Sequence, residues 1–253
     1  MNPLKLLIFG SIIFLLTLDV SVAGDLNGSD NSYSNSDAGS FSDLNALIED
    51  LPENSTITLD WDYFYTNDDF LEGIVINKPL IINGNNHVID ANFNSRIFDV
   101  SASGVVLNDI VFINGKSNAD GGAVRLGSDG QINNCTFKDN YADRGGAVFS
   151  GYLSRISNSN FINNSAAGDG GAVYQFADGY VSSSRFIGNS ASRGGALYLD
   201  EAYVSDSDFE DNSAVNGGAV YMDGGSALSS TFIDNHATDS GGALADRKSG
   251  SAG

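Results

Sequence analysis

The feature that most constrains this chain is an internal repeat of about 24 residues. The tripeptide Gly-Gly-Ala recurs at spacings of 24, 25, 24, 23 and 24 residues, beginning at Gly121, Gly145, Gly170, Gly194, Gly217 and Gly241. Self-similarity at a fixed period of this length is typical of solenoids, in which each repeat is one structural unit that stacks on its neighbours. The repeat by itself therefore indicates a solenoid.

Two further columns of identical residues keep the same period. A phenylalanine occurs in five successive repeats, at Phe137, Phe161, Phe186, Phe209 and Phe232. An asparagine follows each of them three residues later, at Asn140, Asn164, Asn189, Asn212 and Asn235. A buried side-chain amide can bond the same amide one turn above and one turn below. We therefore interpret the asparagines as an internal structural ladder and not as a binding site.

Each repeat breaks into three short β-type runs, and no helical pattern of useful length occurs within the repeats. Between the second and third runs lie Asn134, Asn158 and Asp206, residue types that tolerate a left-handed turn. Strands this short can bury one face only if equivalent strands stack in register, about 4.8 Å apart. The sequence predicts an all-β protein, a right-handed single-stranded parallel β-helix over residues 56–247, with registered repeats from residue 121.

The N-terminal segments predict export and a cap. Residues 1–23 combine a basic start, an apolar run and small residues before a cleavage site, which is typical of a secretory signal peptide. Residues 24–40 are mostly Gly, Asn, Ser and Asp, and we expect a flexible leader. Residues 41–55 carry apolar residues at helical spacing before Pro52, which predicts a capping helix over the first rung.

After cleavage no apolar stretch long enough to span a membrane is expected. Residues 248–253 form a short polar tail, and we expect no comparable cap at that end. The pattern contains no information on the oligomeric state.

The formal charge of −20 repels phosphate backbones and argues against nucleic-acid binding. It could attract Ca²⁺, and the acids that follow the phenylalanine column, such as Asp139, Asp211 and Asp234, would stack along one turn. Calcium needs six to eight converging oxygens, so a solvated acidic edge is the favoured interpretation and no cofactor or metal site is expected. The single cysteine, Cys135, stands where other repeats have serine, which predicts a packed and unreactive thiol.

One column suggests a ligand. The residue after Gly-Gly-Ala-Val/Leu is an aromatic in four successive repeats, at Phe149, Tyr174, Tyr198 and Tyr221, whereas the preceding repeat has Arg125 there. A column that accepts arginine should face outward, and exposed aromatic faces can bind sugar rings. The alternative, slightly favoured, is a stacking ladder that only stabilises the sheet.

Catalysis finds little support in the residue pattern. A glycosidase needs two carboxylates that face one sugar bond. The adjacent pair Asp68 and Asp69 lies in an early loop without a partner motif, and the two histidines, His87 and His236, are isolated in the sequence. We expect no catalytic residues.

The Phe-x-x-Asn and Gly-Gly-Ala-Val/Leu motifs resemble the repeats of chlamydial polymorphic outer-membrane proteins. With the run from Ile76 to Asp90 they also resemble adhesin-like proteins of methanogenic archaea, over roughly residues 41–245. The resemblance implies a pectin-lyase-like fold and a secreted, cell-surface protein that attaches to glycans or surface proteins. The alternatives are a β-helix polysaccharide lyase or glycoside hydrolase, and a purely structural envelope protein.

Overall fold

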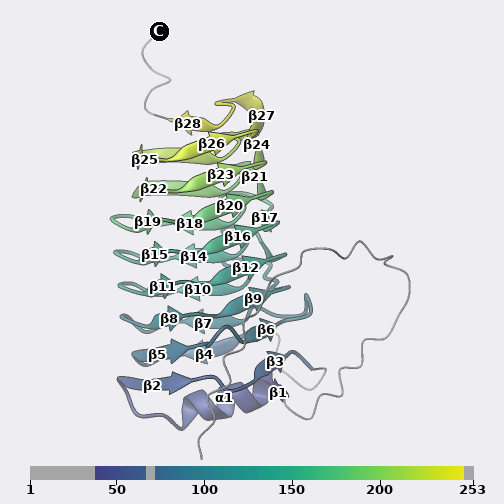
Figure 1. Cartoon of the computed structure of the whole chain (residues 1–253), viewed down its shortest axis with the longest axis vertical. Coiled ribbons are helices and arrows are strands. Elements are labelled where there is room, and N and C mark those ends of the chain that lie inside the picture. The colour runs from purple at the N-terminus through teal and green to yellow at the C-terminus, as the bar shows by residue number, and fades with distance from the viewer. Residues whose placement is uncertain (1–37, 67–71, 248–253) are drawn as a thin grey trace, which may run out of the picture. The chain divides into compact units, whose positions relative to one another are not determined.

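The computed structural model describes residues 38–66 and 72–247, and these residues form a parallel β-helix (Figure 1). Successive turns of the chain stack as rungs, and equivalent strands pair in parallel one repeat apart, as Phe137 does with Phe161. The predicted all-β fold and parallel coil are confirmed. Within the described ranges no helix is long and apolar enough to cross a membrane.

Each turn passes through three faces and one short ladder. The first face consists of β4 (Ile74–Ile76), β7 (Phe98–Val100), β10 (Val124–Leu126), β14 (Val148–Ser150), β18 (Val173–Gln175), the first halves of β22 (Leu197–Ser205) and β25 (Val220–Leu228), and β28 (Leu244–Asp246). The second face consists of β2 (Ser55–Thr58), β5 (Leu80–Asn83), β8 (Val106–Asn108), β11 (Gln131–Asn133), β15 (Arg155–Ser157), β19 (Tyr180–Ser182) and the second halves of β22 and β25. Because β22 and β25 run through the corner without a break, the two faces are one sheet.

The third face is a separate sheet of the described residues. Its strands are β1 (Ala38–Ser40), β3 (Asp62–Phe64), β6 (Val88–Asp90), β9 (Val111–Ile113), β12 (Thr136–Lys138), β16 (Asn160–Ile162), β20 (Arg185–Ile187), β23 (Asp208–Glu210) and β26 (Thr231–Ile233). The short ladder then leads back to the first face, through β13 (Tyr141–Ala142), β17 (Ser165–Ala166), β21 (Ser190–Arg193), β24 (Ser213–Asn216) and β27 (His236–Ser240).

The core is a set of columns of identical side chains. The phenylalanine rings of β9, β12, β16, β20, β23 and β26 stack with centroids 4.7–4.9 Å apart, and five of the six are fully buried. In the turn before them, Asn134, Asn158 and Asp206 have φ of 51–52°, which confirms the predicted left-handed conformation. Cys135 is fully buried in its serine column, and burial raises the pKa of its thiol to about 12.

The asparagines form a continuous buried chain of amides. Asn140 donates through Nδ2 to Oδ1 of Asn164 at 2.8 Å, and the same contact recurs up to Asn235 at 2.9–3.0 Å. Each Oδ1 also accepts the backbone N–H of the asparagine one rung earlier, as from Asn140 to Asn164 at 3.1 Å. The second Nδ2 proton binds a phenylalanine carbonyl, in the case of Asn164 that of Phe137 at 3.1 Å. Every polar group of the inner amides is therefore satisfied, as burial requires.

The two glycines of each repeat serve different needs. Gly145 has φ of +60°, a conformation in which a Cβ atom is strained. At Gly146, a Cβ atom would lie 2.1 Å from the carbonyl oxygen of Gly171 one rung above. The corner thus requires a left-handed residue followed by a residue without a side chain, which explains the period of the Gly-Gly pairs.

The helix of the N-terminal cap begins at the predicted residue 41 but is shorter than predicted. The helix α1 (Phe41–Glu49) ends six residues before the expected residue 55, and it buries Phe41, Leu44 and Ile48. Of the expected leader at residues 24–40, the last three form β1, which pairs with β3 through backbone hydrogen bonds that need no apolar side chain. Ser40 is the N-cap of α1 and forms a capping box with Asp43. The predicted signal peptide at residues 1–23 and the predicted tail at residues 248–253 lie outside the described residues.

Replacing Asn164 by alanine should destabilise the coil by about 3 kcal/mol, because the change leaves several buried donors and acceptors of neighbouring rungs without partners. Urea unfolding followed by circular dichroism measures the change. The exposed Asn160 lies on the same rung, and Asn160→Ala is the matched control with a loss below about 0.5 kcal/mol. Equal effects of the two variants would contradict a structural role of the ladder.

One core column contains two buried side-chain oxygen atoms without hydrogen-bond partners among the described residues. Ser150 and Gln175 are register neighbours and fully buried, and neither Ser150 Oγ nor Gln175 Oε1 has a hydrogen-bond partner. Leu126 and Leu199 occupy the same column on either side. Gln175→Leu should therefore raise the free energy of unfolding by about 1–2 kcal/mol, measured in urea. A decrease would indicate that a buried water bridges the two oxygens, and Ser150→Ala would then show the same decrease.

Candidate functional site

The predicted aromatic column lies on the first face, one ring from each of β14, β18, β22 and β25. The rings of Phe149, Tyr174, Tyr198 and Tyr221 stack with centroids 5.0, 4.8 and 5.3 Å apart and interplanar angles of 12–17°. In such a stack the ring faces cover one another. A sugar ring binds an aromatic side chain through a free face, and this column offers few.

The column points away from the core, but it is covered from the side, so the expectation that its ring faces are exposed is wrong for the central members. Tyr174 and Tyr198 are only 7% and 4% exposed. The guanidinium of Arg144 lies 5.0–5.2 Å from the ring centroids of Phe149 and Tyr174, and Arg193 lies 4.9–5.3 Å from those of Tyr198 and Tyr221. The column is therefore a stabilising stack with cation–π contacts.

These arginines belong to an alternating ladder that the sequence reasoning missed. The residue before each Gly-Gly is in turn Asp120, Arg144, Asp169, Arg193, Asn216 and Ser240. Arg144 binds Asp120 through two hydrogen bonds of 2.8 and 3.0 Å, and Arg193 binds Asp169 through two of 2.7 and 2.8 Å. Alternation of acid and base at the repeat period was the signal available in the sequence.

Arg144, Tyr174 and Tyr198 are held in their ordinary charge states. The hydrogen bond with Asp120 raises the pKa of Arg144. Burial raises the pKa of Tyr198 to about 12, and burial together with the hydrogen bond to Asp200 raises that of Tyr174. None of these groups is poised to exchange a proton near neutral pH, so the ladder can position neighbours but is poorly suited to acid–base chemistry.

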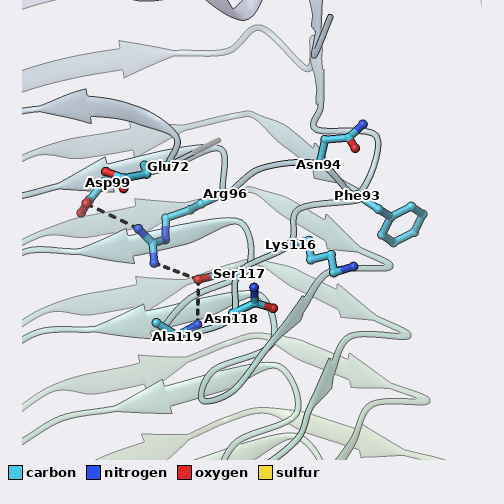
Figure 2. Close-up of a pocket in the computed structure, with 9 residues that line it drawn as sticks. All are labelled: Glu72, Phe93, Asn94, Arg96, Asp99, Lys116, Ser117, Asn118 and Ala119. Carbon is cyan, nitrogen blue, oxygen red and sulfur yellow. Dashed lines mark hydrogen bonds and ion pairs between the residues drawn. The ribbon is translucent and has the colours of Figure 1, made fainter. Parts of the chain in front are cut away.

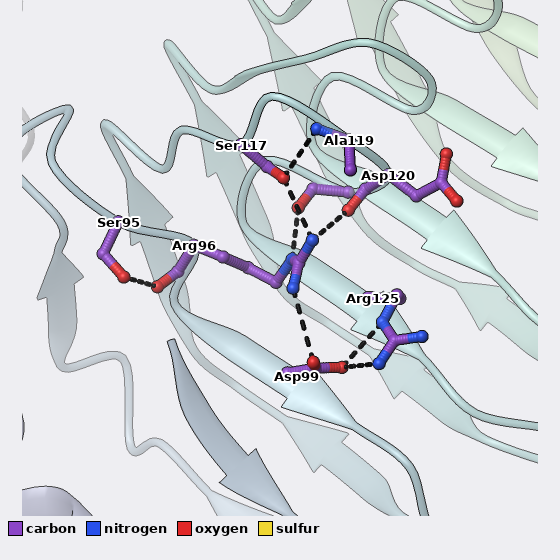
Figure 3. A network of polar contacts seen from close by, with 8 residues as sticks. Ser95, Arg96, Asp99, Ser117, Ala119, Asp120 and Arg125 are labelled. Atoms are coloured by element: carbon purple, nitrogen blue, oxygen red, sulfur yellow. Dashed lines mark hydrogen bonds and ion pairs between the residues drawn. The ribbon is translucent and has the colours of Figure 1, made fainter. Parts of the chain in front are cut away.

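At the lower end of the same corner lies a network centred on Arg96 (Figure 3). Its guanidinium donates to the carbonyl oxygens of Gly121 and Asp120 at 3.0 and 2.8 Å, and to Ser117 Oγ at 3.0 Å. Nη1 lies 3.4 Å from Asp99, which also accepts from Arg125 Nε at 2.7 Å. Burial lowers the pKa of Arg96, and Asp99 opposes that effect. The ion pair with Asp99 explains why the aromatic column accepts an arginine at position 125.

Beside this network is an open pocket of about 570 Å³ (Figure 2). Its lining comprises Glu72, Phe93, Asn94, Arg96, Asp99, Lys116, Ser117, Asn118 and Ala119. Arg96 and Asp99 form one wall and are used in the network, whereas Phe93, Lys116 and Asn118 are exposed on the other side. The pocket thus combines one engaged charged wall with one exposed wall of aromatic and polar side chains.

The exposed wall carries polar side chains that are free to bind a ligand. In the part of the chain that the structure describes, the side chains of Lys116 and Asn118 have no hydrogen bond or ion pair. Phe93 is 49% exposed and has φ of +55°, which is unusual for a bulky residue. Its ring is therefore held at the rim by a strained backbone, although burial would gain hydrophobic free energy.

Few groups among the described residues could support catalysis or metal binding. No group of three His, Cys, Asp or Glu that could hold a metal ion occurs in residues 38–66 and 72–247. Asp68 and Asp69 lie outside the described residues. His236 is exposed on β27, but His87 is not isolated as expected, since its Nδ1 lies 3.0 Å from Asp62 Oδ1. No nucleophile in contact with this pair is evident among the described interactions.

The repeat of the Chlamydia polymorphic membrane protein family matches two segments of the chain, residues 158–175 and 229–245. Each segment runs from the turn before a column phenylalanine through the asparagine and the Gly-Gly corner to the first face. The match therefore covers structural columns and not the pocket. No curated protein and no solved structure matches the chain. The matched repeat and the β-helix fit a surface protein.

Raising the pH until the buried tyrosines ionise should lower the stability of the fold. Folding raises the pKa of Tyr198 from 10 to about 12, so its contribution to stability is complete below pH 10 and is lost as the pH rises through 12. We expect the urea midpoint to fall over this window, and to fall less in Tyr198→Phe. Tyr203→Phe removes an exposed hydroxyl instead and is the control. Identical pH profiles for wild type and Tyr198→Phe would contradict the prediction.

Proposed function

We propose that this chain is an exported, non-catalytic, adhesin-like surface protein that attaches to glycans or to surface proteins of other cells. The observation that carries the proposal is the open pocket with an exposed phenylalanine ring beside unpaired Lys116 and Asn118. Its volume lies within the usual range of about 300–1,000 Å³ for small-ligand sites. Export rests on the signal-like pattern of residues 1–23.

The pocket has the chemistry of a sugar site. The free part of the Phe93 ring can stack on the apolar face of a pyranose. Lys116 and the Asn118 amide can donate hydrogen bonds to hydroxyl or carboxylate oxygens at the ring edge. Because Arg96 already orders the opposite wall, a ligand would meet a largely preformed surface, which lowers the entropic cost of binding.

The absence of catalysis is part of the proposal and is supported by the same contacts. A glycosidase acts through two free carboxyl groups, but Asp99 is neutralised by Arg96 and Arg125. The guanidinium of Arg96 is held by backbone carbonyls, so it is poorly available as a base. The remaining charged groups of the pocket, Glu72 and Lys116, suit recognition.

The pocket predicts a simple test on the secreted chain. Phe93→Ala and Lys116→Ala should each weaken binding to a glycan identified on an array by about tenfold or more, since each removes a contact worth about 1–2 kcal/mol. Trp61→Ala and Lys138→Ala replace an exposed aromatic and an exposed lysine elsewhere and are the matched controls. Binding that all four variants retain would remove the pocket from the proposal.

The same pocket gives the enzyme alternative its one supporting observation, since Glu72 and Lys116 line a single cavity. A polysaccharide lyase would release unsaturated ends from a uronate polymer, and a glycoside hydrolase would release reducing ends. If the wild-type chain formed such products and Lys116→Ala abolished their formation, the protein would be an enzyme and the attachment proposal would be wrong. A purely structural envelope protein would show neither binding nor turnover.

A further inference from the structure

A second surface carries aromatic side chains that are exposed, at the corner between the first and second faces. Tyr152, Phe176, Tyr180 and Tyr203 are 38–44% exposed and come from three successive rungs. We name these four residues the corner strip. They lie in or beside the loops that join β14 to β15 and β18 to β19, at the left of Figure 1, and in the corresponding part of β22.

The loops of the corner stack on one another, which arranges the strip along the axis of the coil. Leu153 N–H donates to the carbonyl of Ala177 at 3.2 Å, and Asp178 N–H donates to that of Glu201 at 3.1 Å. Tyr180 and Tyr203 are register partners in β19 and β22. Neighbouring rungs are about 4.8 Å apart, so the strip presents aromatic groups at a short, regular interval.

The rings of the strip are not stacked on one another, unlike the rings of the buried column. None of the four belongs to a stacked pair among the described residues, whereas every ring of the buried column does. Two of the three hydroxyls are anchored, since Tyr180 Oη lies 2.6 Å from Ser205 Oγ, and a hydrogen bond to Asp178 raises the pKa of Tyr152. Anchored hydroxyls with exposed rings are suited to rigid contact with a ligand.

The charge around the strip is negative. Asp129, Asp178 and Glu201 occupy the loops of the corner and are all exposed, and Arg155 is the one basic residue of these loop segments (residues 127–131, 151–155, 176–180 and 200–203). Carboxylates accept hydrogen bonds from hydroxyl and ammonium groups and repel carboxylates and sulfates. An anionic polymer is therefore disfavoured at this surface.

We propose that the corner strip binds a linear polysaccharide that carries free amino groups, with sugar rings on the exposed aromatic faces and ammonium groups at Asp178 and Glu201. A polymer of rings suits a surface that repeats in one direction, whereas a compact ligand would engage only one rung. The strip shares no residue with the pocket beside Arg96, so this second site goes beyond the proposed function and can fail independently of it.

The probe is a glucosamine hexamer, titrated calorimetrically into the folded chain at low ionic strength. The double variant Phe176→Ala, Tyr203→Ala should weaken binding at least tenfold. Asp178→Asn keeps the shape and the turn and should weaken binding severalfold, and with Glu201→Gln it should reduce the salt dependence. Phe93→Ala in the pocket and Tyr141→Ala on the short ladder should leave the affinity unchanged. Circular dichroism and thermal unfolding confirm that each variant is folded.

Several outcomes would overturn the assignment. They are failure of the wild-type chain to bind the hexamer, equal affinity in the double variant, and equally tight, salt-independent binding of the N-acetylated hexamer. Tighter binding of a lysine-rich peptide through the same residues would make the strip a protein-docking surface. Loss of hexamer binding in Phe93→Ala alone would move the site to the pocket and leave the strip without a ligand.

Discussion

The rest of the structure depends on the buried chain of asparagine amides. At each inner asparagine, such as Asn164, Oδ1 accepts two hydrogen bonds from the rung below and Nδ2 donates two more. A shift of one rung by a single residue would leave all of these groups buried without partners, at about 1–3 kcal/mol each. The ladder therefore selects one register, and this register aligns the stacked phenylalanine rings and the Gly-Gly corners.

Much of this interior could be predicted because the environment inside a coil repeats with the chain. A side chain that faces inward meets its own equivalents above and below, so identical residues recur at the repeat period, and a single sequence displays the columns. The buried thiol of Cys135 followed from the serine column in the same way. The strand β1 could not be foreseen, because it joins its sheet through backbone groups and its side chains show no apolar pattern.

The aromatic column shows where such reasoning fails. Arg125 predicts that the column is exposed to solvent, but Asp99 neutralises Arg125, and further along the column Arg144 and Arg193 cover the rings. Contacts between different columns determine exposure, and these contacts depend on which side chains lie next to each other across a corner. Periodicity within one column contains no information on them. The alternation of Asp and Arg before each Gly-Gly pointed to paired charges, and it becomes informative once neighbouring columns are considered together.

Both surfaces proposed for binding lie where the repeat is least regular. Phe93 belongs to the turns before the registered repeats begin. The corner strip lies in loops that change in length, with four residues between Gln175 and Tyr180 but three between Leu199 and Tyr203. Inside the coil, a changed residue disturbs two neighbouring rungs, whereas at a loop it meets solvent on one side. Variation that creates binding chemistry is therefore tolerated mainly at the corners. The need for matching side chains in successive rungs allows the fold to be predicted from the repeat. The same need confines ligand-binding residues to positions where the repeat is irregular.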